Sequence, residues 1–368
     1  MSTPDLSVYQ ERLDRARAAM RAAGVDVLLV GPSADLRYLT GIDAHLSERL
    51  NLLVLPAEGP AGFVVPRLEA PNVAGMSSLL TLHVWDETDA PAELVARVVG
   101  SGAKTAAVGD HLYSVFLIRL QTALPGLTWE PSGPLLRDLR MHKDAAELDA
   151  LREAARQTDA AWSAFLESGP IAGLTERQAM ERLMALTTRQ GMRPGFGICA
   201  SGPNSASPHY STGDRVIQEG DAVIFDWGGI HEGYYSDVTR TVFVGQPTDE
   251  YRRVYDAVLR ANEAAFAAVR PGVACEDVDR AARDVITDAG YGPAFIHRVG
   301  HGLGLDVHEE PYLVSGNTLP LAPGMTFSDE PGIYLEGNLG VRIEDTVVCT
   351  EDGAERINAA PRDLVVMD

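Results

Sequence analysis

Hydrophobic and polar positions in the first third of the chain follow helical and strand-like patterns in turn. In residues 8–23, Leu13, Ala16 and Met20 fall on one helical face, and Gly24 follows as a typical helix stop. The apolar run 25–30 predicts a buried strand, and we expect a loop over 32–41 after it. Further patterns predict strands in NLLVL and GFVVP, a helix at 91–99, a strand at 105–108 and a helix at 112–123. This alternation is typical of an α/β domain.

The segment PGLTWEPSGP, residues 125–134, is rich in proline and glycine and predicts a domain boundary. We expect an alanine- and charge-rich helix after it, over residues 144–166. The chain is therefore predicted to contain two domains, residues 1–135 and residues 140–368.

The second domain shows signs of an internal duplication. Gly173 and Gly272 each open a similar helical segment, and Thr175 with Gln178 forms a capping-box pattern in the first of them. Carboxylates also recur at matched offsets in two predicted strand pairs: Asp226 six residues after Gly220, Glu330 six after Gly324, Asp237 four after Gly233 and Glu344 four after Gly340. Two half-domains are therefore expected to supply two carboxylates each.

These carboxylates lie in apolar surroundings, which disfavours a solvated acidic face. A turn centred on His231 and Glu232 is predicted to place Asp226 and Asp237 directly opposite each other on one face of a hairpin. Opposed side chains lie about 5 Å apart, so two unpaired carboxylates would repel each other. One such Asp alone would more often be a salt-bridged or turn-edge residue. Four of them exceed what the single Arg342 can neutralise, and this favours a metal site.

Histidines supply further candidate ligands. His297, His301 and His308 fall in the stretch HRVGHGLGLDVHE, and His209 falls in SGPNSASPHY. A lone histidine is usually structural, but glycines flank His301 on both sides and allow close backbone approach. Four carboxylates and one imidazole suit two hard divalent cations, best Mn(II), with Zn(II) and Co(II) as alternatives. Two such ions can share a bridging hydroxide as nucleophile.

Composition narrows the class of protein. The chain of 368 residues carries 52 acidic and 31 Lys and Arg residues, a net charge of −21, which argues against nucleic acid or an anionic membrane as partner. Cys199, Cys275 and Cys349 show no disulfide or metal spacing and suit a reducing compartment. We find no signal-peptide pattern and no apolar run of the roughly 20 residues that a membrane span needs, so we expect a cytoplasmic protein.

The combined motifs resemble the pita-bread metallopeptidases, which include prolidases, aminopeptidase P and methionine aminopeptidases. The resemblance covers nearly all of residues 140–360 and is carried by DWGGIHEGYYSDVTRT, GHGLGLDVHE, DEPGIY and VRIEDT. The N-terminal region with DLRYLTGI is similar to the creatinase/prolidase N-terminal domain, which methionine aminopeptidases lack. The resemblance thus implies an α/β (α+β) chain in which a creatinase/prolidase-like domain precedes a duplicated pita-bread catalytic domain, in the proline-specific branch.

The resemblance also implies roles for individual residues. The implied metal ligands are Asp226, Asp237, His301, Glu330 and Glu344. Glu330 would also shuttle a proton to the leaving nitrogen, and His209 and His308 would stabilise the developing gem-diolate. The implied substrate-binding residues are His209, His297, His308 and Arg342; His297 would hold the proline side, and Arg342 would pair with a metal-bound carboxylate.

Two departures from the family pattern stand out. Asp329 precedes Glu330 where an apolar residue is usual, and is expected to disturb the local charge balance. Arg193 is unexpected in the stretch 191–199; it is more often a surface residue, but Arg193, Arg298 or Arg49 are candidates to bind a dipeptide carboxylate. The family commonly forms homodimers, so the loop 43–50 that carries Arg49 is a candidate to act on the partner's site.

The primary hypothesis is a dinuclear Xaa-Pro dipeptidase that hydrolyses proline dipeptides through a metal-bridging hydroxide. The alternative is an aminopeptidase P-like enzyme acting on tripeptides and longer Xaa-Pro peptides. A non-catalytic binding module and a metal-free creatinase-like amidinohydrolase are both disfavoured, because the sequence has a metal-ligand residue at all five positions of the family pattern.

Overall fold

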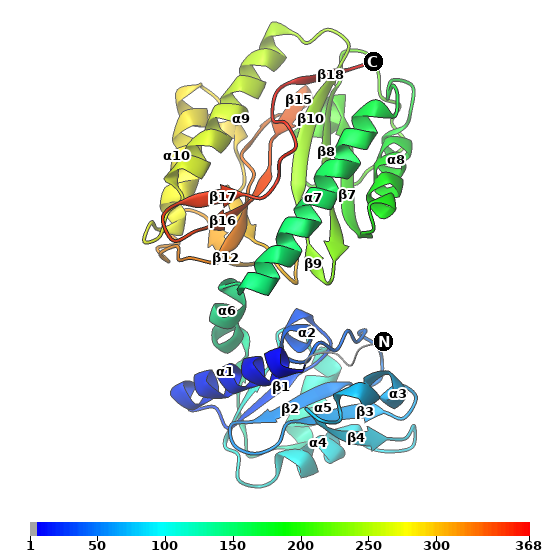
Figure 1. Cartoon of the computed structure of the whole chain (residues 1–368), viewed down its shortest axis with the longest axis vertical. Coiled ribbons are helices and arrows are strands. Elements are labelled where there is room, and N and C mark those ends of the chain that lie inside the picture. Colours follow the sequence, from blue (N-terminus) through cyan, green and yellow to red (C-terminus); the bar gives the residue numbers. More distant parts are fainter. Residues whose placement is uncertain (1–5) are drawn as a thin grey trace. The chain divides into compact units, whose positions relative to one another are not determined.

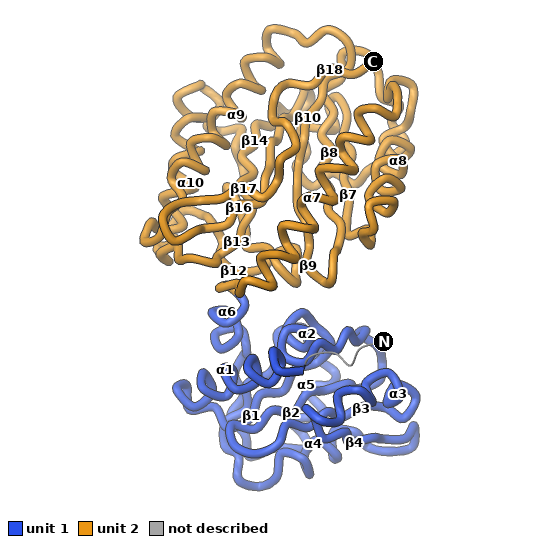
Figure 2. Tube along the Cα trace, in the orientation of Figure 1, with its two compact units in different colours: residues 1–140 blue, residues 141–368 orange. Residues whose placement is uncertain are grey.

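The computed structural model describes residues 6–368, which form two compact units that meet in sequence between Arg140 and Met141 (Figures 1 and 2). The division falls a few residues after the predicted boundary segment 125–134. That segment instead contains β6 (Thr128–Pro131), an edge strand that pairs in parallel with β5 (Thr105–Val108). Its proline and glycine residues flank a strand at a sheet edge, where a missing backbone donor is tolerated.

Unit 1 is a mixed α/β unit built on one six-stranded sheet. The strands run in the order β4 (Thr81–Trp85), β3 (Gly62–Pro66), β2 (Leu52–Pro56), β1 (Val27–Val30), β5 and β6. The helices are α1 (Ser7–Ala23), α2 (Ala34–Thr40), α3 (Ala70–Val73), η1 (Ala74–Met76), α4 (Pro91–Val99), α5 (Ser114–Ala123) and α6 (Gly133–Met141), which ends at the first residue of unit 2.

The segment 32–41, predicted as a loop, is a short helix. The Ser33 hydroxyl accepts a hydrogen bond from the backbone N–H of Leu36 and caps the start of α2, and Gly41 ends it with a φ of 73°. Leu36 and Leu39 are fully buried on one face of α2. The prediction was wrong because a helix of two turns offers too few residues for a clear helical period, so packing decides its structure.

Unit 2 contains two sheets of five strands and a separate two-stranded ribbon. The first sheet has the order β18 (Val365–Met367), β10 (Val238–Val244), β8 (Ala222–His231), β7 (Arg193–Ser201), with β9 (Tyr234–Tyr235) paired to β8. The second has the order β12 (Glu309–Leu313), β11 (Gly300–Gly302), β13 (Thr326–Asp329), β16 (Asp345–Cys349), β17 (Ala354–Arg356). The ribbon joins β14 (Gly332–Leu335) to β15 (Leu339–Arg342), and two short helices, η2 (Gly202–Ala206) and η3 (Gly292–Ala294), lie in loops.

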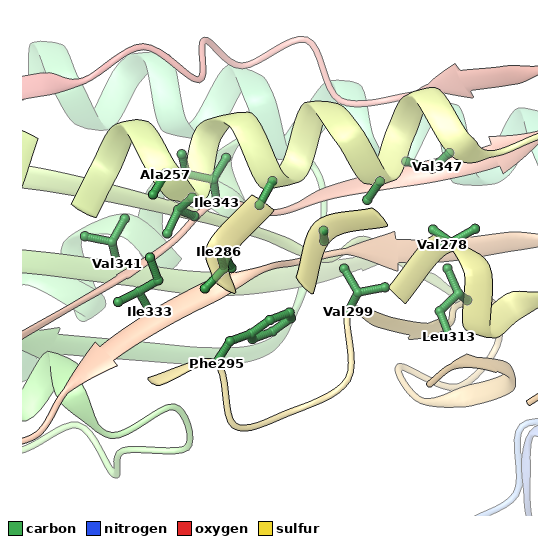
Figure 3. Packing of buried hydrophobic residues seen from close by; sticks show 14 of the residues in the cluster. Ala257, Val278, Ile286, Phe295, Val299, Leu313, Ile333, Val341, Ile343 and Val347 are labelled. Atoms are coloured by element: carbon green, nitrogen blue, oxygen red, sulfur yellow. The ribbon is translucent and has the colours of Figure 1, made fainter. Parts of the chain in front are cut away.

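Four long helices cover these sheets: α7 (Ala145–Glu167), α8 (Glu176–Arg189), α9 (Asp249–Ala268) and α10 (Cys275–Asp288). Figure 1 shows α7 and α8 beside β7 and β8, and α9 and α10 on the side of β12, β16 and β17. Each pair packs on its own apolar cluster. One cluster centres on Trp162, Phe225 and Trp227, and the other, shown in Figure 3, includes Val278, Ile286 and Phe295.

The predicted duplication has a clear structural counterpart. Helices α8 and α10 are both 14 residues long, and their first residues, Glu176 and Cys275, lie 99 positions apart in the sequence. An isolated β-bridge precedes each of them, Thr175 with Val216 and Ala274 with Pro320. The Thr175–Gln178 capping box is formed as predicted. Helices α8 and α10 can therefore be aligned residue by residue through this offset.

The two halves meet closely where β15 runs along η2. The backbone N–H of Gly340 donates to the Ser205 hydroxyl at 2.7 Å, and a Cβ atom placed on Gly340 would lie 1.9 Å from the Ser205 carbonyl oxygen. Only a glycine allows this approach between backbones.

We predict that Gly340→Ala lowers the free energy of unfolding by about 3 kcal/mol, because the new methyl group forces two buried backbones apart. Chemical unfolding of the full chain, followed by circular dichroism, measures this loss. Gly353→Ala is the matched control, since a Cβ atom there meets nothing within 4 Å. Equal stability of the two variants would contradict the close approach.

Candidate metal centre

The five predicted metal ligands come together at one place between the two sheets of unit 2. Asp226 lies on β8, and Asp237 directly precedes β10. Glu330 directly follows β13, Glu344 directly precedes β16, and His301 is the middle residue of β11. Strand ends from both halves therefore supply the side chains.

The register of the first hairpin differs from the prediction. Asp226 pairs with Thr239, so Asp237 lies diagonal to Asp226 instead of directly opposite. The turn falls one residue later than expected, at Glu232 and Gly233, whose φ angles are 48° and 98°. A two-residue turn with both φ positive is the favoured hairpin turn, and glycine accepts it without strain. Since a shift of one turn position moves the register by two residues, Asp237 still lies on the predicted face.

In the second half, the carboxylates face each other directly. β13 pairs Asp329 with Asp345, and the same register carried one residue further places Glu330 opposite Glu344. The backbone also joins the halves at this point, because Thr239 and Glu344 form an isolated β-bridge between the two sheets.

The side chains are close enough to share cations. His301 Nε2 lies 3.3 Å from Glu330 Oε1 and 3.6 Å from Asp237 Oδ2. Ligand atoms of Asp237, His301 and Glu344 all lie within 4.8 Å of one another, which makes these three buried residues a candidate metal-binding group. Arg342 donates to Asp226 Oδ2 at 2.6 Å, and Asp226 Oδ1 is buried with no hydrogen-bond partner among residues 6–368.

Burial opposes negative charge on these carboxylates. Burial, and then repulsion from Glu344, raises the pKa of Asp237 well above its usual range. Burial and repulsion from Glu330 do the same to the pKa of Glu344. Burial raises the pKa of Glu330 to about 7, and burial lowers the pKa of His301 to about 3. A neutral imidazole among crowded oxygen donors, one of them unpartnered, fits divalent cations well, because cations remove the repulsion that the single Arg342 leaves.

Comparison with known proteins agrees with this geometry. Residues 149–351 match metallopeptidase family M24, and residues 12–142 match the Creatinase/Prolidase N-terminal domain. The chain belongs to metallopeptidase family M24. It is thus a metal-dependent peptidase, and the predicted family and fold class are confirmed.

Similar proteins span the whole chain. The crystal structure of dipeptidase PepE from Mycobacterium ulcerans is 45% identical, covers 100% of both chains and superposes with a TM-score of 0.93. A prolidase structure from Thermococcus sibiricus is 36% identical over 98% of this chain and 99% of its own, with a TM-score of 0.94. An Xaa-Pro dipeptidase from Lactobacillus delbrueckii subsp. lactis is 32% identical over 96% of this chain and 98% of its own.

The candidate metal centre opens into a cavity of about 420 Å³. Its wall contains all five predicted ligands together with the predicted substrate residues His209, His297, His308 and Arg342. The rings of His301 and His308 meet edge to face at 4.0 Å. Burial lowers the pKa of His308, and burial lowers the pKa of His297 to about 4, so both imidazoles are neutral at pH 7.

Hydroxyl groups that the sequence analysis missed hold the carboxylates in place. Thr239 Oγ1 donates to Glu344 Oε2 at 2.6 Å, and Ser328 Oγ donates to Glu330 Oε1 at 3.0 Å. Tyr334 accepts a hydrogen bond from Arg342 Nη1 at 2.8 Å, and its hydroxyl also lies 2.9 Å from His297 Nε2. Ser328 stands two positions before Glu330, so strand alternation alone pointed to the same face. Tyr334 closes the DEPGIY motif, but its contacts with Arg342 and His297 could not be read from that motif.

The three arginine candidates for a substrate carboxylate differ in position. Arg298 lines the cavity, and its guanidinium lies 4.2 Å above the ring of Tyr312. Arg193 is exposed at the start of β7. Arg49, in unit 1, is bound to Glu87 at 2.7 Å and to Glu48.

Asp329 is buried, and its carboxylate faces Arg356 at 3.9 Å. Burial raises its pKa well above the usual range. Strand alternation sends the side chains of Asp329 and Glu330 to opposite faces, so Asp329 lies behind the strand relative to the metal ligands.

The structure also bears on the expectations for the cysteines and for membrane-spanning segments. Cys199, Cys275 and Cys349 are free and buried, as expected for inert core thiols. Within residues 6–368, no helix combines the length and apolar character that crossing a membrane requires.

We predict a pH-dependent stability difference between metal-free wild-type protein and Glu330→Gln. The folded chain binds the Glu330 proton with a pKa of about 7, whereas an unfolded glutamate titrates near pH 4.3. The free energy of unfolding of the wild-type protein, relative to that of Glu330→Gln, is therefore highest at low pH. This difference falls by up to about 3 kcal/mol as the pH rises from about 4 to 7. Urea unfolding of both chelator-treated proteins across this range measures it.

Asp256→Asn provides the control, because the Asp256 side chain on α9 is 63% exposed. An advantage that stays flat or grows between pH 4 and pH 7 would contradict the raised pKa of Glu330.

Proposed function

We propose that this M24 peptidase is an Xaa-Pro dipeptidase. The observation that carries the proposal is Arg298, a guanidinium in the wall of the same cavity as the candidate metal ligands and three histidines. A dipeptide presents its free carboxylate one residue beyond the scissile bond, and a guanidinium binds a carboxylate through paired, charge-assisted hydrogen bonds. The dipeptidase and prolidase names of the similar proteins support this substrate class.

The proposed ligands are Asp226, Asp237, His301, Glu330 and Glu344, which would hold two divalent cations, most favourably Mn(II). The donor set of carboxylate oxygens with one imidazole nitrogen suits Mn(II), and Zn(II) and Co(II) are the alternatives. Bound cations would supply an activated water and polarise the scissile carbonyl.

The residues of this chain would then orient the substrate and move the proton. His209 and His308 would donate hydrogen bonds to the oxygen that gains negative charge, and His297 would hold the proline side. Glu330 would carry a proton to the leaving nitrogen. Protonation is essential because the proline nitrogen of a tertiary amide carries no hydrogen. Arg342 would keep Asp226 in position through their ion pair.

We also propose that the protein is cytoplasmic. Three free, buried thiols suit a reducing cytoplasm. We also propose a homodimer in which the loop 43–50 acts at the partner's site.

Purified protein loaded with Mn(II) is expected to cleave an Xaa-Pro dipeptide at least tenfold faster, by kcat/KM, than an Xaa-Pro-Xaa tripeptide. The reason is that charge-assisted hydrogen bonds between Arg298 and the dipeptide carboxylate would contribute about 1.4 kcal/mol or more to binding. Proline-free dipeptides serve as substrate controls, and parallel loading with Zn(II) and Co(II) ranks the metals. Preference for the tripeptide would overturn the proposal in favour of an aminopeptidase P-like activity.

Arg298→Met is expected to raise KM for the dipeptide roughly tenfold or more with little change in kcat, because the lost ion pair binds substrate and transition state alike. The same substitution should change KM for an Xaa-Pro amide, which lacks the carboxylate, much less. Arg260→Met is the matched control, because this arginine on α9 is 58% exposed and is not among the carboxylate candidates. Equal effects on the acid and the amide would assign the carboxylate to another group.

A further inference from the structure

An ion pair on α10 lies behind the substrate cavity. Asp279 and Arg283 stand one helical turn apart, with Nε to Oδ2 at 2.8 Å and Nη2 to Oδ1 at 2.9 Å, a two-pronged contact. The Asp279 side chain is 2% exposed. A two-pronged pair of this kind has a fixed geometry, so it can hold other groups in fixed positions.

Both members of the pair also bind the backbone of residues 295–299. Arg283 Nη1 donates to the Phe295 carbonyl at 2.9 Å, and Arg283 Nη2 donates to the His297 carbonyl at 2.7 Å. The backbone N–H of Val299 donates to Asp279 Oδ1 at 2.9 Å. Figure 3 shows Phe295 and Val299 at the two ends of this loop, with their side chains in the apolar cluster beside α10. The pair is therefore hydrogen-bonded to the loop at its two ends, Phe295 and Val299, and at His297 in its middle.

The residues held between these points are the ones that face the substrate. His297 and Arg298 both line the cavity, while their neighbour Ile296 is 65% exposed. Residues 295–299 form no helix or strand, so no regular ladder of hydrogen bonds fixes their backbone. The three bonds to Asp279 and Arg283 hold this backbone, together with the hydrogen bond from the Glu330 N–H to the Val299 carbonyl at 2.8 Å. The His297 and Arg298 side chains are further placed by their contacts with Tyr334 and Tyr312.

The duplication provides an internal comparison. With the offset of 99 positions between Glu176 and Cys275, Asp279 and Arg283 correspond to Met180 and Met184 in α8. Both methionines pack in the apolar cluster of the first half. A buried ion pair is rarely more stabilising than the apolar side chains that could replace it. Packing a helix at this position therefore does not require charge. The corresponding residues 196–200 of the first half also reach the cavity, through Phe196 and Ile198, but they lie in β7, whose pairing with β8 fixes their backbone. The ion pair occurs in the half whose cavity-lining segment 295–299 has no such strand pairing.

We propose that Asp279 and Arg283 act as a positioning pair for substrate recognition. They hold the loop 295–299 so that His297 and Arg298 meet the proline end and the free carboxylate of the substrate. The inference rests on the proposed dipeptidase function and names two residues, outside the cavity, on which its substrate affinity depends.

The test is the double variant Asp279→Met/Arg283→Met, which copies the side chains of the first half and leaves no buried charge unpaired. The expected result is a roughly tenfold rise in KM for an Xaa-Pro dipeptide, with kcat within about twofold and unchanged metal content, since charge-assisted hydrogen bonds are lost only behind the binding residues. The rise for an Xaa-Pro amide should be clearly smaller, because that substrate does not use Arg298.

Asp256→Met/Arg260→Met is the matched control, since this pair has the same spacing on α9, an Nε to Oδ2 distance of 2.9 Å, and side chains 63% and 58% exposed. A KM equal to that of the control, an equal loss of kcat and affinity, or an equal rise for acid and amide would each overturn the inference. If the double variant does not fold, the single variant Asp279→Asn gives the same comparison with a smaller expected rise in KM. Asparagine keeps the oxygen that accepts from the Val299 N–H but weakens the bond to Arg283, because it carries no negative charge.

Failure of the proposed function has a different signature. In that case the wild-type protein itself leaves the Xaa-Pro dipeptide intact. If only the positioning role fails, the wild-type protein cleaves the dipeptide and the double variant behaves like the Asp256/Arg260 control.

Discussion

Four carboxylates buried around one imidazole are the constraint on which unit 2 depends. Their mutual repulsion, together with burial, keeps the pKa values of Asp237, Glu330 and Glu344 above the ordinary range, and Arg342 is the arginine that pairs with this group directly. The surrounding structure serves to hold these charges in place. Hydroxyls of Thr239 and Ser328 donate to the carboxylates. A close backbone contact between Gly340 and Ser205 ties together the halves that supply them.

Much of this arrangement could be predicted from the sequence, because the duplication leaves the same spacing between glycines and carboxylates in both halves. Equal offsets from glycines identified Asp226 with Glu330 and Asp237 with Glu344, and all four reach the same cavity. The exact strand register could not be predicted, since it depends on a single residue in the turn. Glu232 takes a positive φ, which few side chains adopt and which no local pattern signalled. The period of two along a strand is insensitive to that shift, so the predicted face was correct although the predicted partner was wrong.

Other features depend on contacts between distant parts of the chain, and their sequence signal is correspondingly weak. Tyr334 contacts both Arg342 and His297. It closes the DEPGIY motif, but the motif does not show which residues its hydroxyl bonds. Helix α2 is too short for a periodic pattern, and its cap at Ser33 becomes evident only in three dimensions. Asp329 was expected to disturb the charge balance of the metal ligands. Its buried carboxylate lies 3.9 Å from Arg356 on the other side of the strand, and repulsion from Glu330 contributes to its raised pKa. Only tertiary packing reveals this placement.

The bond between Thr239 and Glu344 joins residues 105 positions apart in the chain. The entropy of closing the intervening loop opposes a contact of such long range, so its stability depends on the packing of both halves. In an isolated half, the two carboxylates at its open edge would lie in water, where charge is well solvated. The electrostatic character of the site therefore arises at the moment when the two halves dock. The candidate metal centre is therefore complete only when both halves of unit 2 are docked.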